Sequence, residues 1–176
     1  MAVKGQEFAG YDSRTLPGMG LGYATSNRGA CHLKHDVFAE DMSDQSAAGK
    51  AEPCKTSQDA IATIDSTGLC LFTSGSWDLS DYADQIDAAC EGNWTKERLQ
   101  ETGERIWNLE RQFNLAAGLT RADDTLPPRL LNDPVPSGTA KGRVCELTTM
   151  LDEYYELRGW SSDGVPTDAT IDRLGL

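Results

Sequence analysis

The sequence predicts an all-α protein, an irregular multi-helix domain whose helices are joined by segments rich in glycine and proline. Apolar residues recur at helical spacing in four separate segments, and capping residues or glycines stand at the expected helix ends. No window shows the sustained alternation of apolar and polar residues that a half-buried strand requires. A length of 176 residues suits one domain with a sizeable core, so we predict a single helical domain over residues 1–176.

The first expected helix lies within a glycine-rich stretch, residues 10–34. We predict that residues 19–27 form it and that its small side chains allow a close packing contact. The three alternating glycines from Gly18 to Gly22 resemble a phosphate-binding loop only weakly, because no strand pattern precedes them.

The next helix is predicted from Lys50 to Ile64. Pro53 would stand in its first turn, where the missing N–H costs least, and Gly68 would follow its end. Residues 69–72 are apolar and are expected to form a short buried run.

Two further helices are predicted, one over residues 78–90 and a longer one that begins at the N-cap residue Thr95 and ends at Gly118. Their core-facing residues are expected to be Leu79, Tyr82, Ile86 and Ala89 in the first helix, and Leu99, Ile106, Leu109 and Phe113 in the second.

Residues 123–139 are rich in Pro, Asp and Gly and are predicted to be extended and turn-rich. A long helix over residues 141–157 is expected to follow, with Gly159 after its end. Thr167 is a suitable N-cap for a short terminal helix that ends near Leu174. The core side of the long helix is predicted to consist of Val144, Leu147, Leu151 and Tyr154.

The charge balance excludes several classes of function. Twenty-eight acidic and sixteen basic side chains give a net charge of −12, which argues against binding to nucleic acid, where Lys and Arg contact phosphates. No apolar run approaches the roughly 20 residues of a membrane helix, and residues 1–7 lack the apolar stretch of a secretory signal. We therefore expect a cytoplasmic protein with no nucleic-acid or membrane partner.

The five cysteines indicate neither a disulfide framework nor a complete metal site. Their number is odd, and no two lie within ten residues of each other, so there is no C-x-x-C pair. Most of them are expected to be buried thiols that pack as small apolar side chains. One thiolate could still join a site whose other ligands come from elsewhere.

Two short segments contain most of the chemically active residue types. Residues 26–35 contain a thiol, two imidazoles and two cations, a set that suits either proton transfer and anion binding or a merely polar loop. Residues 65–70 place a carboxylate, a glycine and a thiol close together. These residues could bind a heterocycle and a metal, or they could simply form the C-cap of a helix beside core residues.

A set of motifs distinguishes between these alternatives. In order along the chain they are Val3–Glu7, Tyr11–Arg14, Gly18–Leu33, Asp65–Cys70, Gly103–Asn114, Asp123–Pro127 and Met150–Trp160. Together they closely resemble successive motifs of the tungsten-dependent aldehyde:ferredoxin oxidoreductase family, and the resemblance covers essentially the whole chain. The part of the family that the chain resembles is its C-terminal helical domain.

The resemblance implies an activity and a set of cofactors. Family enzymes oxidise an aldehyde to a carboxylate at tungsten, or molybdenum, held by two pterin dithiolenes of the molybdopterin type, and electrons then pass through a [4Fe-4S] iron–sulfur cluster to ferredoxin. The family motif D-x-x-G-L-C matches Asp65–Cys70. It implies that Asp65, Leu69 and Leu71 contact the pterin and that Cys70 is a metal ligand of the cluster.

The resemblance assigns the other two site residues to the first segment. His32 matches the catalytic histidine that exchanges protons, and Lys34 matches a basic position that contacts the cofactor. Nothing in the match gives a role to His35.

Several parts of the family site are absent from the sequence. The other cluster cysteines and the larger pterin-binding domain have no counterpart here. We therefore expect this chain to need a domain or subunit that supplies them, to be inactive alone, and to expose an apolar face at Leu69, Leu71 and Phe72. The alternative is a truncated, non-catalytic helical module that binds a partner protein.

Overall fold

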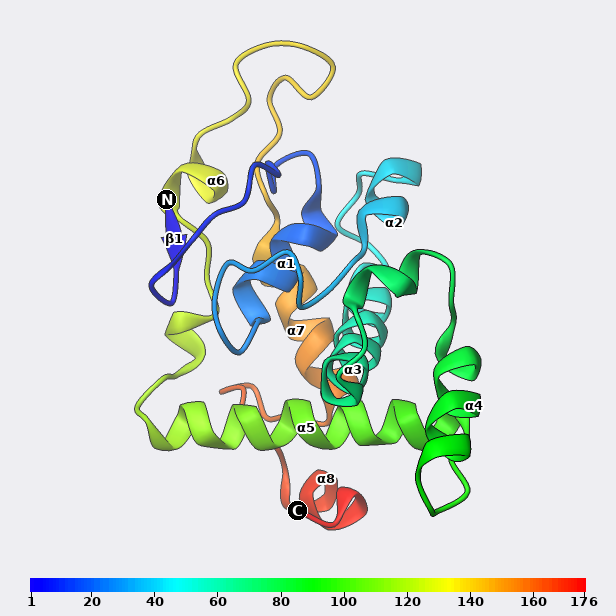
Figure 1. Ribbon diagram of the computed structural model, residues 1–176. Helices are drawn as coiled ribbons and strands as arrows, with labels where there is room; N and C mark the ends of the chain where they lie inside the picture. Colours follow the sequence, from blue (N-terminus) through cyan, green and yellow to red (C-terminus); the bar gives the residue numbers. More distant parts are fainter.

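The computed structural model describes residues 1–176 and confirms a predominantly α-helical fold (Figure 1). Its only sheet is an antiparallel hairpin of two strands, β1 and β2, each two residues long. No helix combines the length and the apolar character needed to cross a membrane. The elements are β1 Ala2–Val3, β2 Gln6–Glu7, α1 Pro17–Thr25, α2 Phe38–Ser43, α3 Ala51–Thr67, α4 Leu79–Ala89, α5 Lys96–Ala116, α6 Pro128–Asn132, α7 Leu147–Arg158 and α8 Asp168–Leu174, with 3₁₀ turns η1 Leu71–Gly75 and η2 Arg121–Asp123.

Helix α1 is the centre of the fold, and every one of its residues is buried. Its three glycines each meet a different neighbour: a Cβ on Gly18 would press on Asp41, one on Gly20 on Ser13, and one on Gly22 on the His35 ring. The pattern therefore serves close packing, as the sequence predicted for this stretch.

The N-terminus of α1 is capped from another element. Leu16, at the N-cap, has no side-chain oxygen, and the buried carboxylate of Asp41 in α2 instead accepts the N–H groups of Gly18 and Met19, each at 2.9 Å. Lys50 Nζ lies 3.4 Å from the same carboxylate. Because orphan N–H groups at a helix start need acceptors, this contact fixes α2 against α1.

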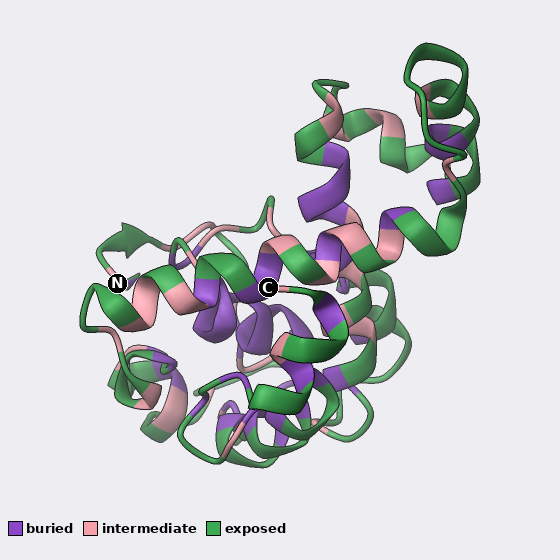
Figure 2. Ribbon diagram, turned by 90° about the horizontal axis from the view of Figure 1, so that it is seen from below, coloured by how far each residue is buried: buried purple, intermediate pink, exposed green.

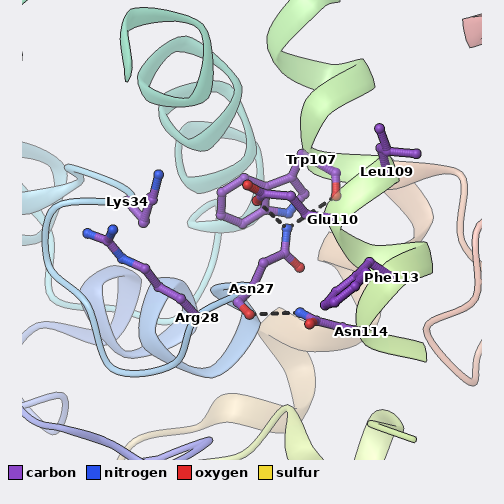
Figure 3. A pocket seen from close by; sticks show the side chains of 8 residues that line it. All are labelled: Asn27, Arg28, Lys34, Trp107, Leu109, Glu110, Phe113 and Asn114. Atoms are coloured by element: carbon purple, nitrogen blue, oxygen red, sulfur yellow. Dashed lines mark hydrogen bonds between the residues drawn. The ribbon is translucent and has the colours of Figure 1, made fainter. Parts of the chain in front are cut away.

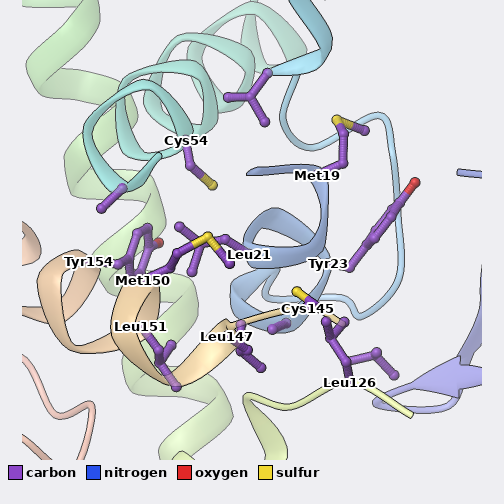
Figure 4. Close-up of a cluster of buried hydrophobic side chains, with 14 of the residues drawn as sticks. Met19, Leu21, Tyr23, Cys54, Leu126, Cys145, Leu147, Met150, Leu151 and Tyr154 are labelled. Atoms are coloured by element: carbon purple, nitrogen blue, oxygen red, sulfur yellow. The ribbon is translucent and has the colours of Figure 1, made fainter. Parts of the chain in front are cut away.

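Helices α1, α3 and α7 pack around the larger of two apolar clusters, part of which Figure 4 shows. Its fully buried members include Leu21, Tyr23, Cys54, Met150 and Tyr154. Helix α5 crosses α3 at Gly103, where any Cβ would overlap the backbone of Asp59. Figure 1 shows α8 on the far side of α5.

Two buried ionic networks lie beside this cluster. Arg158 pairs with Asp59, and both side chains are fully buried; Gln58 and Tyr154 complete the guanidinium's hydrogen bonds. In the second network Asp124 accepts hydrogen bonds from Arg111, Lys4 and Tyr155. These partners satisfy charges that would be costly to bury alone.

The smaller cluster contains five buried residues: Ile64, Leu79, Tyr82, Ala83 and Leu99. It lies where η1 and α4 pack on the ends of α3 and α5. Figure 2 shows this part projecting from the main body with largely exposed outer surfaces.

The predicted core stripe of α5 is partly wrong. Leu99 is buried, but Leu109 is 57% and Phe113 73% exposed. The buried side runs instead through Gly103, Trp107 and Arg111, at intervals of four residues. Glycine and arginine carry no apolar signal, so the sequence pattern favoured the wrong stripe.

Most of the predicted helix ends are confirmed. Gly68 and Gly159 adopt left-handed conformations with φ of 76° and 67°, and the Thr95 and Thr167 hydroxyls cap α5 and α8. The helix predicted over residues 141–157 begins only at Leu147. Before it, the amide of Val135 and the carbonyl of Arg143 bond at 3.0 Å, which commits residues 135–143 to a turn.

Candidate functional site

The loop between α1 and α2, residues 26–37, presents the first group of predicted site residues. Arg28 and His32 are exposed, Lys34 is half-buried, and His35 points the opposite way into the protein, where it is fully buried. Residues 27–30 and 32–34 form turns and bends, whereas from His35 to Val37 buried and exposed side chains alternate. The loop thus has one side toward solvent and one side against α1.

The structure brings together two of the residues that the family motif assigns to the cofactor. Lys34 Nζ lies 2.5 Å from Asp65 Oδ2, across 31 residues of sequence. Asp65 stands in the last turn of α3, and its side chain stays 39% exposed. The ion pair links the two segments that the sequence singled out separately, and leaves carboxylate surface accessible to a ligand.

His32 is exposed on the same loop but makes no hydrogen bond or ion pair with Asp65. Its ring packs against Tyr11, with centroids 5.7 Å apart. The neighbouring Cys31 sulfur accepts from the Arg28 guanidinium at 2.8 Å and faces the Leu33 amide at 3.4 Å. An exposed imidazole held against a ring can reach a substrate from outside the chain.

The segment after α3 contains the predicted metal ligand. Gly68, in its left-handed conformation, ends α3 and turns the chain outward, so Cys70 is exposed at the start of η1. The expectation of a buried run over residues 69–72 is wrong, because Leu69 is 37% and Phe72 83% exposed. Only Leu71 is partly covered, by the smaller cluster. The exposed apolar face expected at these positions is present at Leu69 and Phe72.

All five cysteines are free, but only Cys54 and Cys145 are buried, which corrects the expectation that most would be. Burial raises the pKa of each of these two thiols to about 12, so neither is suited to bind metal near neutral pH. Cys70 and Cys90 are exposed and Cys31 is half-buried. Thiolate chemistry is therefore restricted to three positions.

The donor set fits a shared metal site and not a closed one. No group of three or more His, Cys, Asp or Glu side chains in the structure could hold a metal ion. A single exposed thiol at Cys70 fits one corner of a cluster whose other ligands come from outside the chain. The exposed carboxylate of Asp65, held by Lys34, likewise fits the ring N–H groups of a heterocycle.

A groove of about 320 Å³ borders this region (Figure 3). Arg28 and Lys34 from the loop form one wall, and Leu109 and Phe113 from α5 the other. Asn27 links the walls, since its Nδ2 donates to Trp107 O at 3.2 Å and Glu110 Oε2 at 3.1 Å, and its carbonyl accepts from Asn114 at 2.7 Å. The α5 wall was not predicted from the sequence, because Leu109 and Phe113 were both expected in the core.

The helical domain thus presents an accessible carboxylate at Asp65, an accessible thiol at Cys70 and an exposed imidazole at His32. The family model described as aldehyde ferredoxin oxidoreductase, domains 2 and 3, matches residues 1–176. The chain therefore belongs to the aldehyde ferredoxin oxidoreductase family.

Individual relatives support this assignment. Two tungsten-containing aldehyde ferredoxin oxidoreductases, from Pyrococcus abyssi and Pyrococcus furiosus, are each 44% identical over the whole chain. The chain spans only 30% and 31% of their respective lengths. A WOR-like subunit of an aliphatic sulfonate oxidoreductase from Pyrococcus furiosus is 34% identical over 44% of the chain and 14% of its own length.

A solved structure shares the fold. The active-site complex BamBC of benzoyl coenzyme A reductase, bound to 1,5-dienoyl-CoA, superposes with a TM-score of 0.59 and 27% identity. The match covers 76% of this chain and 20% of that one. The same helical arrangement thus forms part of a much longer polypeptide.

Proposed function

We propose that this chain forms one side of an aldehyde-oxidising centre whose remainder is supplied by another domain or subunit. The observation that carries the proposal is the Lys34–Asp65 ion pair, which joins the loop bearing His32 to the segment bearing Cys70. The family membership and the limited share of the relatives' length support a shared site.

Each residue has a distinct proposed role. Asp65 accepts N–H donors of a pterin, Lys34 neutralises and orients that carboxylate, and the backbone near Leu69 and Leu71 borders the ring. Cys70 supplies one thiolate to a [4Fe-4S] cluster. When bound, a tungsten or molybdenum bis-pterin would supply the two-electron redox chemistry.

The proposed overall reaction converts an aldehyde and water into a carboxylic acid, two protons and two electrons. A cluster held in part by Cys70 would carry these electrons, one at a time, to ferredoxin. His32 holds or accepts a proton at a ring nitrogen, because its imidazole is exposed and has one donor and one acceptor nitrogen when neutral.

A chimera tests the proposal. The matched region of the Pyrococcus abyssi enzyme is replaced by this chain, and aldehyde-dependent dye reduction, tungsten and iron are measured. His32→Asn is expected to lower kcat by about 10²–10⁴-fold with both metals retained. Asp65→Ala is expected to reduce tungsten, and Cys70→Ala to reduce iron, whereas Cys90→Ala, which alters another exposed thiol, should change neither.

The alternative function, a non-catalytic helical module that binds a partner protein, is favoured by the exposure of Leu109 and Phe113. It predicts a folded chimera that contains neither tungsten nor iron. Retention of both metals with loss of activity on His32→Asn would exclude it, whereas loss of tungsten on His32→Asn would contradict the assigned roles.

A further inference from the structure

His35 is the one histidine buried in this structure, and its burial is complete. The match to family motifs gives it no role, and its neighbour three residues earlier, His32, has the catalytic assignment. A fully buried imidazole nevertheless loses its hydration, so it requires a packing or hydrogen-bonding partner.

The ring of His35 fills a space that α1 leaves open. It lies over Gly22, where any Cβ would overlap its Cγ, Cδ2 and Nε2 atoms. It also meets the Tyr23 ring edge-on, with centroids 5.3 Å apart. The absence of a side chain at Gly22 is therefore what allows the imidazole to reach α1.

One ring nitrogen bonds to the helix backbone. His35 Nε2 lies 3.2 Å from the Met19 carbonyl oxygen, which can only accept, so Nε2 carries the proton. Nδ1 is buried without a partner. Burial lowers the pKa of His35 to about 4, so the ring is neutral at pH 7 and has this single N–H.

The other end of the loop is held by a different side chain. Lys4 Nζ donates to the carbonyls of Ala24 at 2.6 Å and Ser26 at 3.1 Å, and contacts Asp124 Oδ1 at 2.6 Å. Residues 27–34 therefore run between two anchors, one at each end. The exposed residues Arg28 and His32 and the half-buried Lys34 lie between them.

We propose that His35 is a positioning residue, which fixes the end of this loop on α1 through Nε2–H and through its ring over Gly22. It thereby holds Lys34 toward Asp65 and keeps His32 exposed. The geometric reason is adjacency: Lys34 directly precedes the residue seated over Gly22, so fixing His35 on α1 also fixes the position from which Lys34 reaches Asp65, 2.5 Å away. The functional meaning of the anchor rests on the function proposed above for His32 and Lys34.

Two amide substitutions separate the hydrogen bond from simple space filling. The side-chain nitrogen of glutamine stands as far from Cα as His Nε2 and can still donate to Met19 O. The nitrogen of asparagine corresponds to Nδ1 and falls short. His35→Gln and His35→Asn are thus matched variants that differ in this one contact.

Hydrogen exchange of the whole chain measures the effect. His35→Asn is expected to speed exchange of the Cys31 and Leu33 amides about tenfold relative to α5 amides, as for loss of one buried hydrogen bond. His35→Gln should restore most of that protection. The proposal would be overturned if the two variants gave the same exchange rates at Cys31 and Leu33. It would also be overturned if these rates changed only in proportion to those of the α5 amides.

A spectroscopic measurement on the unaltered chain covers the case in which a variant does not fold. Nitrogen-15 NMR should show His35 as the neutral Nε2–H tautomer from pH 5 to 8. An Nδ1–H tautomer at His35 would overturn the proposal. None of these measurements uses a cofactor or turnover. The anchoring role of His35 can therefore be disproved while the proposed roles of His32 and Cys70 stand, and those roles can be disproved while the anchor stands.

Discussion

The loop of residues 26–37 packs on an apolar cluster of 21 buried residues, whereas the segment after α3 lies on a cluster of five. The loop is held by Lys4 at one end and His35 at the other. The second segment leaves Cys70, Leu69 and Phe72 exposed. The candidate site therefore has one half that this chain organises by itself and one half that it leaves open.

The comparison shows where outside contributions are needed. A preformed loop can present a catalytic side chain without help, because its geometry is set by buried contacts. An exposed thiol on a small cluster is suited to become one ligand among several.

The largest effect is expected in the core beneath the loop. Asp59→Ala removes the partner of the fully buried Arg158 and should lower the free energy of unfolding by about 3–5 kcal/mol, because the guanidinium is left uncompensated. Urea denaturation measures the change. The control Asp152→Ala breaks an exposed pair with Arg121 and should cost about 0–1 kcal/mol. Equal losses would mean that the buried network does not distinguish the two regions.

A somewhat smaller effect is expected in the five-residue cluster. Tyr82→Ala removes its fully buried aromatic ring and should cost about 3 kcal/mol, whereas Phe72→Ala on its exposed surface should stay within about 0.5 kcal/mol.

Helices α3 and α5 contribute to both clusters, so we predict that one transition is seen by tryptophan fluorescence and by circular dichroism. Two separate transitions would contradict the prediction of a single domain.

The loop anchor should appear in the pH dependence of stability. The folded pKa of His35 is near 4 and the unfolded value near 6.5, so between these values the unfolded chain binds more protons. The contribution of neutral His35 to the free energy of unfolding is therefore fully present above pH 6.5. It is lost as the pH falls toward 4, by up to about 3 kcal/mol.

The difference in unfolding free energy between the unaltered chain and His35→Gln, followed from pH 7 to 4, isolates this contribution. The exposed His32 serves as the control, since His32→Asn should leave the dependence in place. A His35→Gln variant that loses stability with acid as steeply as the unaltered chain would show that His35 is not the group responsible.

The smallest effect on stability is expected at the open half of the site. Cys70→Ala should change the free energy of unfolding by no more than about 0.5 kcal/mol, because the thiol is exposed. Iodoacetamide labelling followed by mass spectrometry should modify Cys70 and Cys90 in the folded chain and spare Cys54 and Cys145 until it unfolds. Protection of Cys70 would mean that this half is closed without a partner.

Local features were predictable because short-range chemistry decides them. A glycine at position 68 or 159 allows the left-handed turn that ends a helix, and a threonine at position 95 or 167 supplies the oxygen that begins one. The motif D-x-x-G-L-C likewise located the second half of the candidate site, since its residues are adjacent in sequence.

The side of α5 that faces the core was not predictable in the same way. Apolar spacing favoured Leu109 and Phe113, but the helix turns Gly103 and Arg111 inward. Gly103 faces the core because it contacts the backbone of α3, and Arg111 faces the core because it pairs with Asp124. Both partners are distant in sequence, and neither leaves an apolar signature.

The sequence alone therefore determined the helical class, most helix ends, the acidic charge and the two chemically active segments, because each depends on residues within a few positions of one another. By contrast, the pairing of Lys34 with Asp65, the burial of His35 over Gly22 and the exposure of Cys70 follow from tertiary contacts. These contacts depend on which helices cross and at what distance. That is set by the summed packing of the whole chain and is not encoded at any single position.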